Sequence, residues 1–339
     1  MQGRYRFLPT TLELGKIVSL ALAALFLSIG ASVAADSVKV RFAWKIKGEY
    51  APFYVALEHG FFERHGLDVT MGEGAGSQAA LAAIIQGQED FFVGPGIFAL
   101  SGIQKGIDVK IIAMYHPSAP IVLVSHPDKP VRTPADLEGM KIATSVGETG
   151  TAYLDTLCKL NNVDCAKIDR VMMDQRARSG MFMQRSVDVM SAYTTNDLPL
   201  LKAATNEEFV ILDMPSFGLT VPGMAVVASD KNIAERADVV RRFLAAVDEG
   251  YKATIADPAA AAAAIAKHWN NAPEMKLIEE QVVESVKITP HYDGQPLGYI
   301  SPEIIEFSLG LIKEYENESD MRPAQTFYTN DLLPNGKTD

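Results

Sequence analysis

The chain has 339 residues, of which 48% are hydrophobic and 22% charged, and its formal net charge at pH 7 is −11. These proportions are typical of globular proteins and exclude a disordered chain, a collagen-like repeat and a miniprotein held by disulfides. The length predicts about two domains. The acidic balance argues against nucleic acid as a general partner, because contacts to phosphates need a basic surface.

The N-terminus carries the pattern of an export signal. Residues 1–16 are basic, residues 17–29 are apolar, and small residues follow as far as Ala35. This order predicts a signal peptide over residues 1–35, cleaved after Ala34 or Ala35. The alternative is an uncleaved anchor, but the apolar run is shorter than the roughly 20 residues of a membrane span. We therefore expect an exported, periplasmic protein.

The first part of the mature chain alternates strands and helices. We expect strands over residues 38–44, 67–71, 90–93 and 109–114. We expect helices over residues 52–65, 77–86 and 97–105, the first broken near Gly60 and the second with Ser77 as its N-cap. Such alternation predicts an α/β fold with a largely parallel sheet and helices on both faces.

A second α/β series follows a short β-rich run at residues 121–125. We expect its strands over residues 140–144, 170–173, 187–191 and 209–212. We expect its helices over residues 150–160, 179–185 and 197–204. After a β-like run at residues 221–229 the chain becomes helical, and an apolar face from Val240 to Tyr251 at spacings of three and four residues predicts one long helix.

Two series joined by two extended crossings predict two lobes. Lobe I comprises residues 36–118 and 222–339, and lobe II, residues 119–221, is inserted into it. Ligands of such sheets bind beyond the carboxyl ends of the strands. We therefore expect a binding cleft between the lobes, with the two crossings as hinges.

Cys158 and Cys165 are the two cysteines of the chain. An oxidising compartment allows them to form a disulfide. We expect Cys158 to end a helix and Cys165 to begin the next strand. A metal site is the weaker alternative, because no histidine accompanies the pair at ligand spacing.

Motifs of catalysis and cofactor binding are missing from the sequence. There is no HExxH and no GxSxG, and the glycine-rich run at residues 72–77 is not followed by the GK[ST] of a P-loop. The run Gly72-Glu-Gly-Ala-Gly-Ser77 departs from GxGxxG at its last position, and we interpret it as a tight turn from strand to helix. We expect no cofactor, no metal and no enzymatic activity.

Several segments together resemble a known family in order and spacing. They are Trp44 and residues 49–56, 60–69, 72–77, 133–139, 147–153 and 193–196. They resemble periplasmic substrate-binding proteins of ABC importers, in the subgroup that takes up thiamine pyrimidine precursors, aliphatic sulfonates, taurine or nitrate. The resemblance covers residues 38 to about 315, and APFYVALEHGFFERHGLDV at residues 51–69 is its most specific block.

The resemblance implies a type II, Venus-flytrap fold of two α/β lobes that close on one small molecule. The closed form then docks on an ABC permease in the inner membrane. We expect a monomer, since the protein must open and close.

Two other classes of function stay open. One is an enzyme similar to fungal thiamine pyrimidine synthases, whose cysteine-rich iron motif this chain lacks. The other is a periplasmic sensor component.

Candidate ligand contacts in lobe I follow from strand ends and helix starts. Trp44 is predicted to end the first strand, where its indole can stack on a flat ligand, the alternative being a core tryptophan. Gly76 and Ser77 offer a helix N-terminus, and Gly94 lets a ligand approach the backbone. Tyr115 ends the fourth strand, and the alternative for it is packing at the hinge.

Lobe II offers a helix start at Ser145, Thr149 and Gly150. Hydroxyls and amides there can bind an oxygen-rich group, and the alternative is ordinary helix capping.

Three further candidates follow from the family resemblance. It implies an aromatic contact at Tyr50, where pyrimidine-binding relatives often have histidine, and a ring and an amide at Tyr193 and Asn196. The usual Pro-Asn after the tryptophan is Ile46-Lys47 in this chain.

The candidate side chains point to more than one ligand class. The aromatic residues favour a planar ring. Lys45 and Lys47, with the helix N-termini, suit a sulfonate, taurine, nitrate or a carboxylate. Glu49, Glu73 and Glu148 favour an amine-bearing ligand. We expect a heteroaromatic solute such as a thiamine pyrimidine precursor.

Overall fold

The computed structural model describes residues 34–205, 207–315 and 320–334. Asp36–Asp339 form one compact unit. The predicted signal peptide lies outside the described residues, except for Ala34 and Ala35. None of the described helices is both long and apolar enough to cross a membrane.

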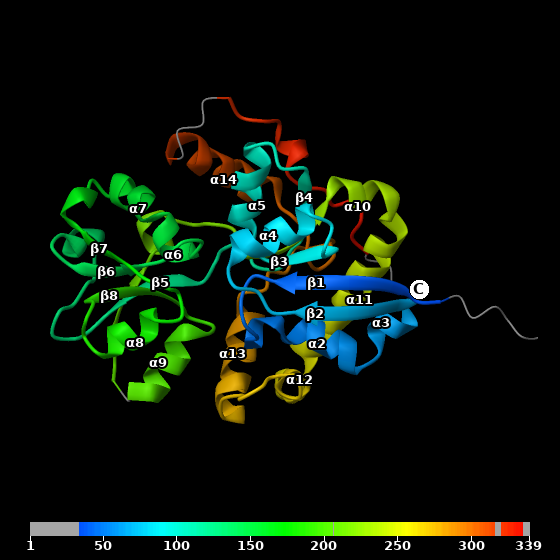
Figure 1. The fold of residues 1–339 in the computed structure, drawn as a ribbon, viewed down its shortest axis with the longest axis horizontal. Coiled ribbons are helices and arrows are strands. Elements are labelled where there is room, and N and C mark those ends of the chain that lie inside the picture. Colours follow the sequence, from blue (N-terminus) through cyan, green and yellow to red (C-terminus); the bar gives the residue numbers. More distant parts are fainter. Residues whose placement is uncertain (1–33, 206, 316–319, 335–339) are drawn as a thin grey trace, which may run out of the picture. The chain divides into compact units, whose positions relative to one another are not determined.

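The first sheet has the strand order β2-β1-β3-β10-β4, and we call the part of the chain around it lobe I (Figure 1). Its strands are β1 (Asp36–Phe42), β2 (Leu67–Gly72), β3 (Phe91–Pro95), β4 (Val109–Met114) and β10 (Met224–Ser229). β1 runs parallel to β2 and β3, whereas β10 is antiparallel to β3 and β4. The sheet is therefore mixed rather than largely parallel, because the returning chain inserts β10 between β3 and β4.

The second sheet has the order β7-β6-β8-β5-β9, and we call the part around it lobe II. Its strands are β5 (Ile121–Ser125), β6 (Lys141–Thr144), β7 (Asp169–Met172), β8 (Val189–Tyr193) and β9 (Val210–Asp213). β6 is parallel to β7 and β8, and β5 is antiparallel to β8 and β9. The two sheets thus have the same arrangement. In each, the strand that follows a crossing, β10 in lobe I and β5 in lobe II, is antiparallel to both of its neighbours.

Helices cover both sheets (Figure 1). In lobe I they are α2 (Ala51–Glu58), α3 (Phe61–Arg64), α4 (Ser77–Ile85) and α5 (Gly96–Gln104). In lobe II they are α6 (Thr149–Ala152), α7 (Leu154–Leu160), α8 (Arg178–Met183) and α9 (Asp197–Thr205). The C-terminal helices are α10 (Asp230–Glu235), α11 (Ala237–Ala256), α12 (Pro258–Ala266), α13 (Met275–Lys287) and α14 (Pro302–Tyr315).

Short 3-10 turns supplement these helices. They are η1 (Gly48–Tyr50), η2 (Pro134–Leu137), η3 (Cys165–Lys167), η4 (Pro215–Phe217) and η5 (Ala324–Thr326).

The core of lobe I lies between β1, α2 and α11. Phe42, Phe53 and Phe243 are fully buried there, and the predicted apolar face of α11, from Val240 to Tyr251, packs into the same cluster. Full burial of each such side chain contributes about 1.5–3 kcal/mol. Ile46 and Tyr50, which follow β1, are buried in the same cluster, so the segment that reaches the other lobe is anchored in this core.

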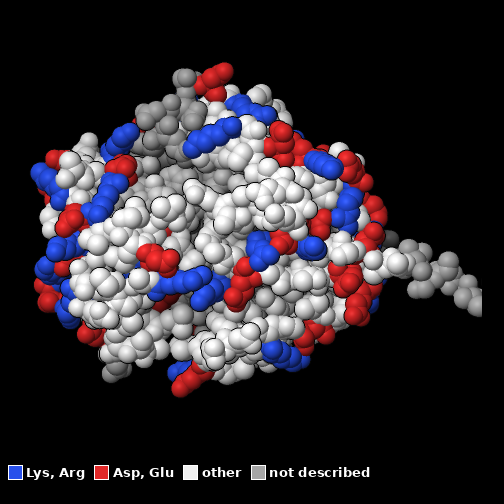
Figure 2. Space-filling view, in the orientation of Figure 1, with Lys and Arg blue, Asp and Glu red and all other residues white. Residues whose placement is uncertain are grey.

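The two crossings between the lobes lie side by side. The amide of Ala119 donates to Val221 O at 2.8 Å, and the amide of Gly223 donates to His116 O at 2.9 Å. α14 packs against α5 of lobe I and α7 of lobe II. The face in Figure 2 carries acidic and basic side chains intermixed, without a broad area of either sign.

Four local expectations are wrong. The first strand ends at Phe42 rather than at Trp44, and the N-cap of α4 is Gly76, with φ +126°, rather than Ser77. The helix expected over residues 150–160 is divided at Tyr153, whose φ and ψ of −107° and 21° leave the helical region. Cys165 begins η3 instead of a strand, because the Asp164 side chain accepts from the amide of Ala166 and starts a turn.

Cys158 and Cys165 are joined as a disulfide, with their Cα atoms 5.7 Å apart. The bond links α7 to η3.

Candidate functional site

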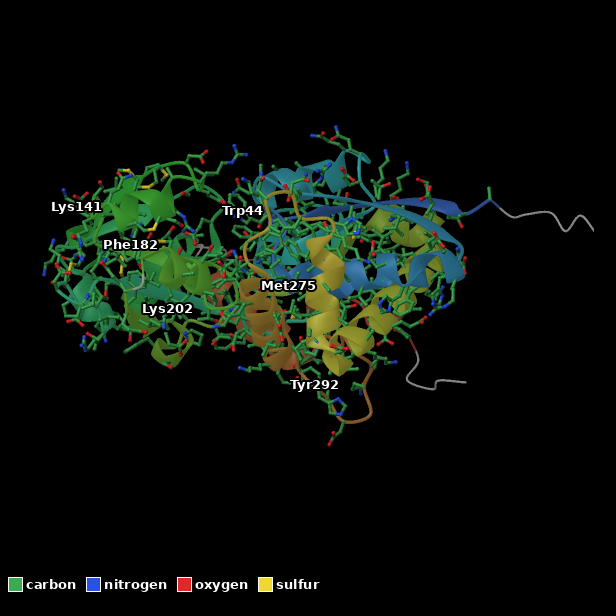
Figure 3. All side chains as sticks on the ribbon, turned by 90° about the horizontal axis from the view of Figure 1, so that it is seen from below. Trp44, Lys141, Phe182, Lys202, Met275 and Tyr292 are labelled. Atoms are coloured by element: carbon green, nitrogen blue, oxygen red, sulfur yellow. A yellow bond between two sulfur atoms is a disulfide. The ribbon has the colours of Figure 1, made fainter. Side chains whose placement is uncertain are left out.

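A pocket of about 280 Å³ lies between the two lobes, beyond the carboxyl ends of β1, β3, β6 and β8. From lobe I it is lined by Ala43, Trp44, Lys45, Lys47, Glu49, Tyr50, Gly76, Ser77, Gly94, Pro95, His116 and Met224. From lobe II it is lined by Gly147, Glu148, Thr149, Gln175, Arg176, Arg178, Ser179, Tyr193, Asn196 and Asp197. Figure 3 places Trp44 where the two lobes meet.

The loop after β1 carries a buried ion pair into the pocket. Lys47 Nζ contacts Glu49 Oε2, and the same ammonium lies 4.6 Å from the centre of the Tyr193 ring and 5.2 Å from that of Tyr50. Burial opposes the charge on both partners, but their mutual attraction together with the neighbouring charges and hydrogen bonds outweighs it, so the pKa of Lys47 is raised and that of Glu49 lowered. The pair is ionised, and its cation faces two aromatic rings.

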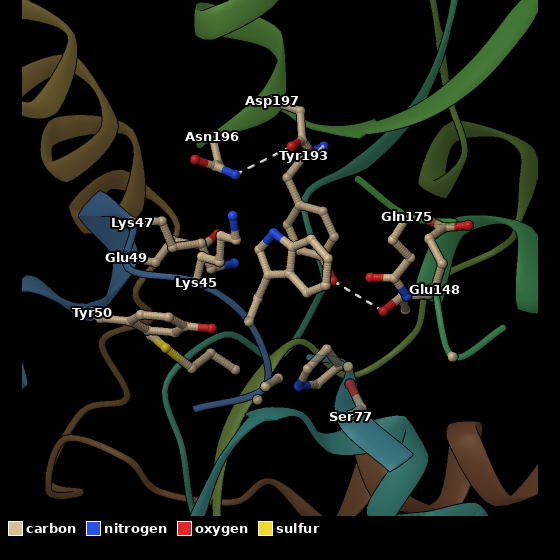
Figure 4. Close-up of a pocket in the computed structure, with 18 of the residues that line it drawn as sticks. Lys45, Lys47, Glu49, Tyr50, Ser77, Glu148, Gln175, Tyr193, Asn196 and Asp197 are labelled. Atoms are coloured by element: carbon tan, nitrogen blue, oxygen red, sulfur yellow. Dashed lines mark hydrogen bonds and ion pairs between the residues drawn. The ribbon is translucent and has the colours of Figure 1, made fainter. Parts of the chain in front are cut away.

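The same glutamate makes a contact across the cleft. Thr195 of lobe II donates a hydrogen bond from Oγ1 to Glu49 Oε1, and both side chains are buried. The residues are 146 positions apart in the sequence. The bond therefore joins the lobes beside the pocket. Figure 4 shows Glu49, Lys47 and Tyr193 among the side chains that surround this pocket.

Glu148 organises the opposite wall. Its carboxylate caps α6 by accepting from the amides of Gly150 at 2.7 Å and Thr151 at 2.9 Å, and Arg178 Nη1 lies 3.3 Å from it. Burial raises the pKa of Glu148, but the Arg178 charge and the hydrogen bonds from Ser191 and Thr151 outweigh it, so the pKa is lowered. Arg178 also donates to Ser191 Oγ at 2.7 Å, while its Nε is buried without a hydrogen bond.

The turn after β8 adds a ring, an amide and an acid. Tyr193 Oη donates to Thr149 Oγ1 at 3.2 Å, and Asp197 accepts from the Tyr193 amide at 2.9 Å and from Asn196 Nδ2 at 3.2 Å. Burial raises the pKa of Tyr193 and of Asp197. The tyrosine is thus a neutral phenol whose ring remains available for stacking.

His116 lies at the back of the pocket on the first crossing. Burial lowers its pKa to about 4, against an opposing effect of the Glu49 charge. Its Nε2 lies 3.3 Å from Ser285 Oγ. At neutral pH it is an uncharged hydrogen-bonding group.

The arrangement suits the capture of a flat, polar molecule. Trp44, Tyr50 and Tyr193 provide aromatic surface, and Thr149, Gln175 and Asn196 provide hydrogen-bonding groups. Among the residues the structure describes, no group of three or more His, Cys, Asp or Glu side chains is placed to hold a metal ion.

The sequence profile of the family described as NMT1/THI5 like matches residues 47–261. The chain belongs to this family. The match begins at Lys47, just before η1, and includes all of lobe II and α11.

Two relatives of this NMT1/THI5-like chain are named for the molecule they bind. It is 26% identical to the riboflavin-binding protein RibY of Chloroflexus aurantiacus over 62% of this chain and 60% of the relative. It is 22% identical to the formylaminopyrimidine-binding protein of Halalkalibacterium halodurans, over 80% of this chain and 84% of the relative. The alignment with RibY thus covers less than two thirds of that protein's length.

A solved structure has the same fold. The periplasmic aliphatic sulphonate binding protein SsuA of Escherichia coli superposes with a TM-score of 0.66 at 16% identity, over 86% of this chain and 96% of that one. The expected two-lobe periplasmic-binding-protein fold is confirmed, and so is the family resemblance.

Most residues predicted as ligand contacts lie on the pocket of this NMT1/THI5-like protein. They are Trp44, Tyr50, Gly76, Ser77, Gly94, Thr149, Tyr193 and Asn196. The glycine-rich turn before α4 is needed for this arrangement, because a Cβ on Gly74 would lie 2.0 Å from Phe42 O.

Tyr115, Ser145 and Gly150 are not part of the described pocket lining. Tyr115 is buried in the core, where its ring stacks on Tyr251 with centroids 3.9 Å apart. Ser145 donates to Met173 O at 2.8 Å and so closes a turn at the end of β6. The Gly150 amide donates to Glu148, which makes it part of the helix cap.

Sequence reasoning missed His116, Arg178 and Asp197 as pocket residues. His116 follows the predicted fourth strand, and Asp197 directly follows Asn196, so their places at strand ends were signals available in the sequence. Arg178 had no comparable signal, because packing of α8 against β8 brings it to the pocket.

Proposed function

We propose that this chain is the solute-binding component of an ABC importer. It captures a small heteroaromatic molecule between its two lobes, and the closed form delivers the molecule to a permease in the inner membrane. The protein acts as a monomer in the periplasm after removal of residues 1–35. Residues 36–118 with 222–339 form lobe I, and residues 119–221 form lobe II.

The pairing of charges inside the pocket is the observation that favours a neutral ring over an anion as the ligand. Lys47 is paired with Glu49, and Arg178 with Glu148. An anion that binds to Lys47 or Arg178 would compete with the carboxylate already paired with it, and separating a buried pair is costly because it strands the other charge. A neutral ring can stack on Trp44 or contact the Tyr193 ring without separating either pair.

The relatives support the same class. Riboflavin and formylaminopyrimidine, in the names of two relatives, are both planar nitrogen heterocycles. The SsuA structure is named for sulphonate, which keeps sulfonate, taurine, nitrate or carboxylate as the second candidate. Lys45 and Arg176, exposed at the edge of the pocket, are the cations that favour it.

Ligand and closure are linked in this proposal. A molecule that contacts Trp44 and Tyr193 touches both lobes and therefore binds the closed state more tightly than the open state.

The synthase-like enzyme and the periplasmic sensor are the alternative classes. Iron retained by the purified protein, or loss of one of its own histidines during turnover, would favour the enzyme.

The test is to express the full chain with export and to purify the processed protein from the periplasm. Native mass spectrometry identifies any co-purified molecule, and isothermal titration then compares riboflavin, formylaminopyrimidine, taurine and nitrate. We expect a heterocycle to bind and Trp44→Ala to weaken it at least about tenfold, which is a loss of about 1.4 kcal/mol. Phe307→Ala, on an exposed ring of α14, is the control. Binding of taurine or nitrate alone would overturn the heteroaromatic class.

A further inference from the structure

A second cavity adjoins the pocket on the far side of Trp44. Its volume is about 800 Å³, and it shares Trp44, Lys45, Asn196 and Asp197 with the first pocket. These shared residues form the partition between the two spaces. Ligand sites typically measure about 300–1,000 Å³. The first pocket, at about 280 Å³, is just below this range, whereas the second lies within it and so has room for a substituent of a ring bound in the first.

Both lobes contribute to this second cavity. Tyr54 of α2, Glu73 and the loop between α12 and α13 come from lobe I, and Leu200 of α9 comes from lobe II. A group bound here would contact both lobes, as the ring does in the first pocket. Occupancy of the second cavity would therefore also favour the closed state.

The lining combines aromatic faces with neutral and acidic hydrogen-bonding groups. Trp269, Asn270 and Asn271 lie in consecutive positions, and Asn271 has a φ of +55° that turns the loop between α12 and α13. Glu73 uses Oε1 to accept from the Ile46 amide at 2.9 Å, which leaves its other oxygen as an acceptor. Aromatic rings next to amides and carboxylates match the apolar faces and hydroxyls of polyols and sugars.

Tyr54 is a hydrogen-bond donor in this cavity. Burial raises its pKa to about 12, with a further contribution from the Glu73 charge. The phenol therefore keeps its proton at neutral pH.

The charge of the lining disfavours an anionic substituent. Glu73 and Asp197 stand against one lysine, Lys45, and His268 Nε2 contacts Glu58 at 2.8 Å. A phosphate or sulfate in this space would face more acidic than basic side chains.

We propose that the second cavity is a subsite for a neutral polyhydroxyl chain, so that the transported solute is a heteroaromatic ring carrying a polyol or sugar-like substituent. The inference rests on the proposed function, in which the ring occupies the first pocket. The partition residues, Trp44 and Asn196 above all, then contact the junction between ring and chain.

The test compares rings that differ only in the chain. Riboflavin and lumiflavin share the isoalloxazine ring, but lumiflavin has a methyl group in place of the ribityl chain. Adenosine and adenine form a second pair, and riboflavin 5′-phosphate adds an anion. Isothermal titration on the processed protein measures the dissociation constant of each compound. In at least one pair, the compound with the polyol or sugar should bind at least about tenfold more tightly than the bare ring, and riboflavin 5′-phosphate should bind more weakly than riboflavin.

Leu200→Trp fills the second cavity from α9, and Leu200 does not line the first. This variant should remove most of the gain in affinity that the polyol substituent gives, and it should change the affinity of the bare ring less than about twofold. Asn270→Ala should also reduce the gain in affinity from the polyol substituent, and it does so by removing an amide rather than by adding a bulky side chain. Leu160→Trp, at an exposed leucine of α7 outside both cavities, is the matched control.

The outcomes separate the two proposals. Equal affinities for both members of a pair would overturn the subsite and leave the heteroaromatic function standing. Binding of neither pair, with formylaminopyrimidine bound, would also overturn the subsite. Binding of taurine or nitrate without any heterocycle would overturn the proposed function itself.

Discussion

Thr195 in lobe II donates a hydrogen bond to the carboxylate of Glu49 in lobe I, and Glu49 is at the same time the ion-pair partner of Lys47. One carboxylate thus stabilises the charge inside the pocket and the contact between the lobes. Because the bond joins the lobes, it contributes to closure as well as to the binding surface.

Thr195→Val should weaken closure. A hydrogen bond to a charged group contributes about 1.5–3 kcal/mol, so we expect the dissociation constant of the solute to rise at least about tenfold. Small-angle X-ray scattering of the ligand-free protein should give a larger radius of gyration. Thr194→Val, one position earlier, is the matched control. Unchanged affinity and radius in Thr195→Val would show that the bond does not hold the lobes together.

Lys47→Met should destabilise the protein, because it leaves the buried Glu49 without its cation. Removing one partner of a buried pair costs about 3–5 kcal/mol, measured as the free energy of unfolding in urea. The double variant Lys47→Met/Glu49→Gln should recover most of that loss, since Gln keeps an acceptor for Thr195 and carries no charge. A double variant no more stable than the single variant would contradict this account.

Stability should fall as the pH drops from 6.5 toward 4 because of His116. Its folded pKa of about 4 lies below the ordinary value of 6.5, so in this window the unfolded chain binds a proton that the folded chain does not. The loss between pH 6.5 and about pH 5 should be about 1.6 kcal/mol. His116→Gln should flatten this dependence in urea titrations, whereas His291→Gln, on an exposed side chain, should not.

Two carboxylates act at lower pH. The pKa values of Glu49 and Glu148 are lowered from 4.5, so their contribution to stability is present above that pH and is lost as the pH falls further. The His116 effect is therefore isolated at higher pH. A profile of His116→Gln identical to that of the unsubstituted protein between pH 5 and pH 6.5 would contradict the assignment.

The same substitution should have opposite effects in two helices. A Cβ on Gly250 of α11 would lie 2.2 Å from Pro52 O of α2, so Gly250→Ala must push the two helices apart. We expect a loss of more than about 2 kcal/mol, against about 1 kcal/mol of gained helix propensity. A Cβ on Gly310 of α14 meets no described atom within 4 Å, so Gly310→Ala should raise the melting temperature. Similar melting temperatures for the two variants would refute the packing argument.

The disulfide should stabilise the fold without affecting the site. A bond between residues seven positions apart closes a short loop, for which the chain-entropy account gives about 2–3 kcal/mol. Cys158→Ala/Cys165→Ala should lose this amount in urea unfolding, and reductant should lower the melting temperature of the natural protein but not that of the variant. Neither cysteine lines the pocket, so solute affinity should stay the same.

The sequence by itself determined the kind and order of the elements. Alternation over residues 38–44 and the repeat from Val240 to Tyr251 predicted a strand and a helix that the structure contains as β1 and α11, because burial of one face imposes those periods. A strand end also predicted Trp44 as a pocket residue and a helix start predicted Thr149, whereas Tyr193 was implied by the family resemblance.

Tertiary structure alone decided which strand-end side chains face the ligand. Tyr115 and His116 are neighbours, yet the first stacks on Tyr251 in the core and the second lines the pocket, since successive side chains point to opposite sides and the sequence does not say which. The antiparallel β10, the approach of Arg178 to Glu148 and the bond from Thr195 to Glu49 all depend on how distant segments pack. Local patterns carry no information on such contacts, because their geometry is set only when the two sheets assemble.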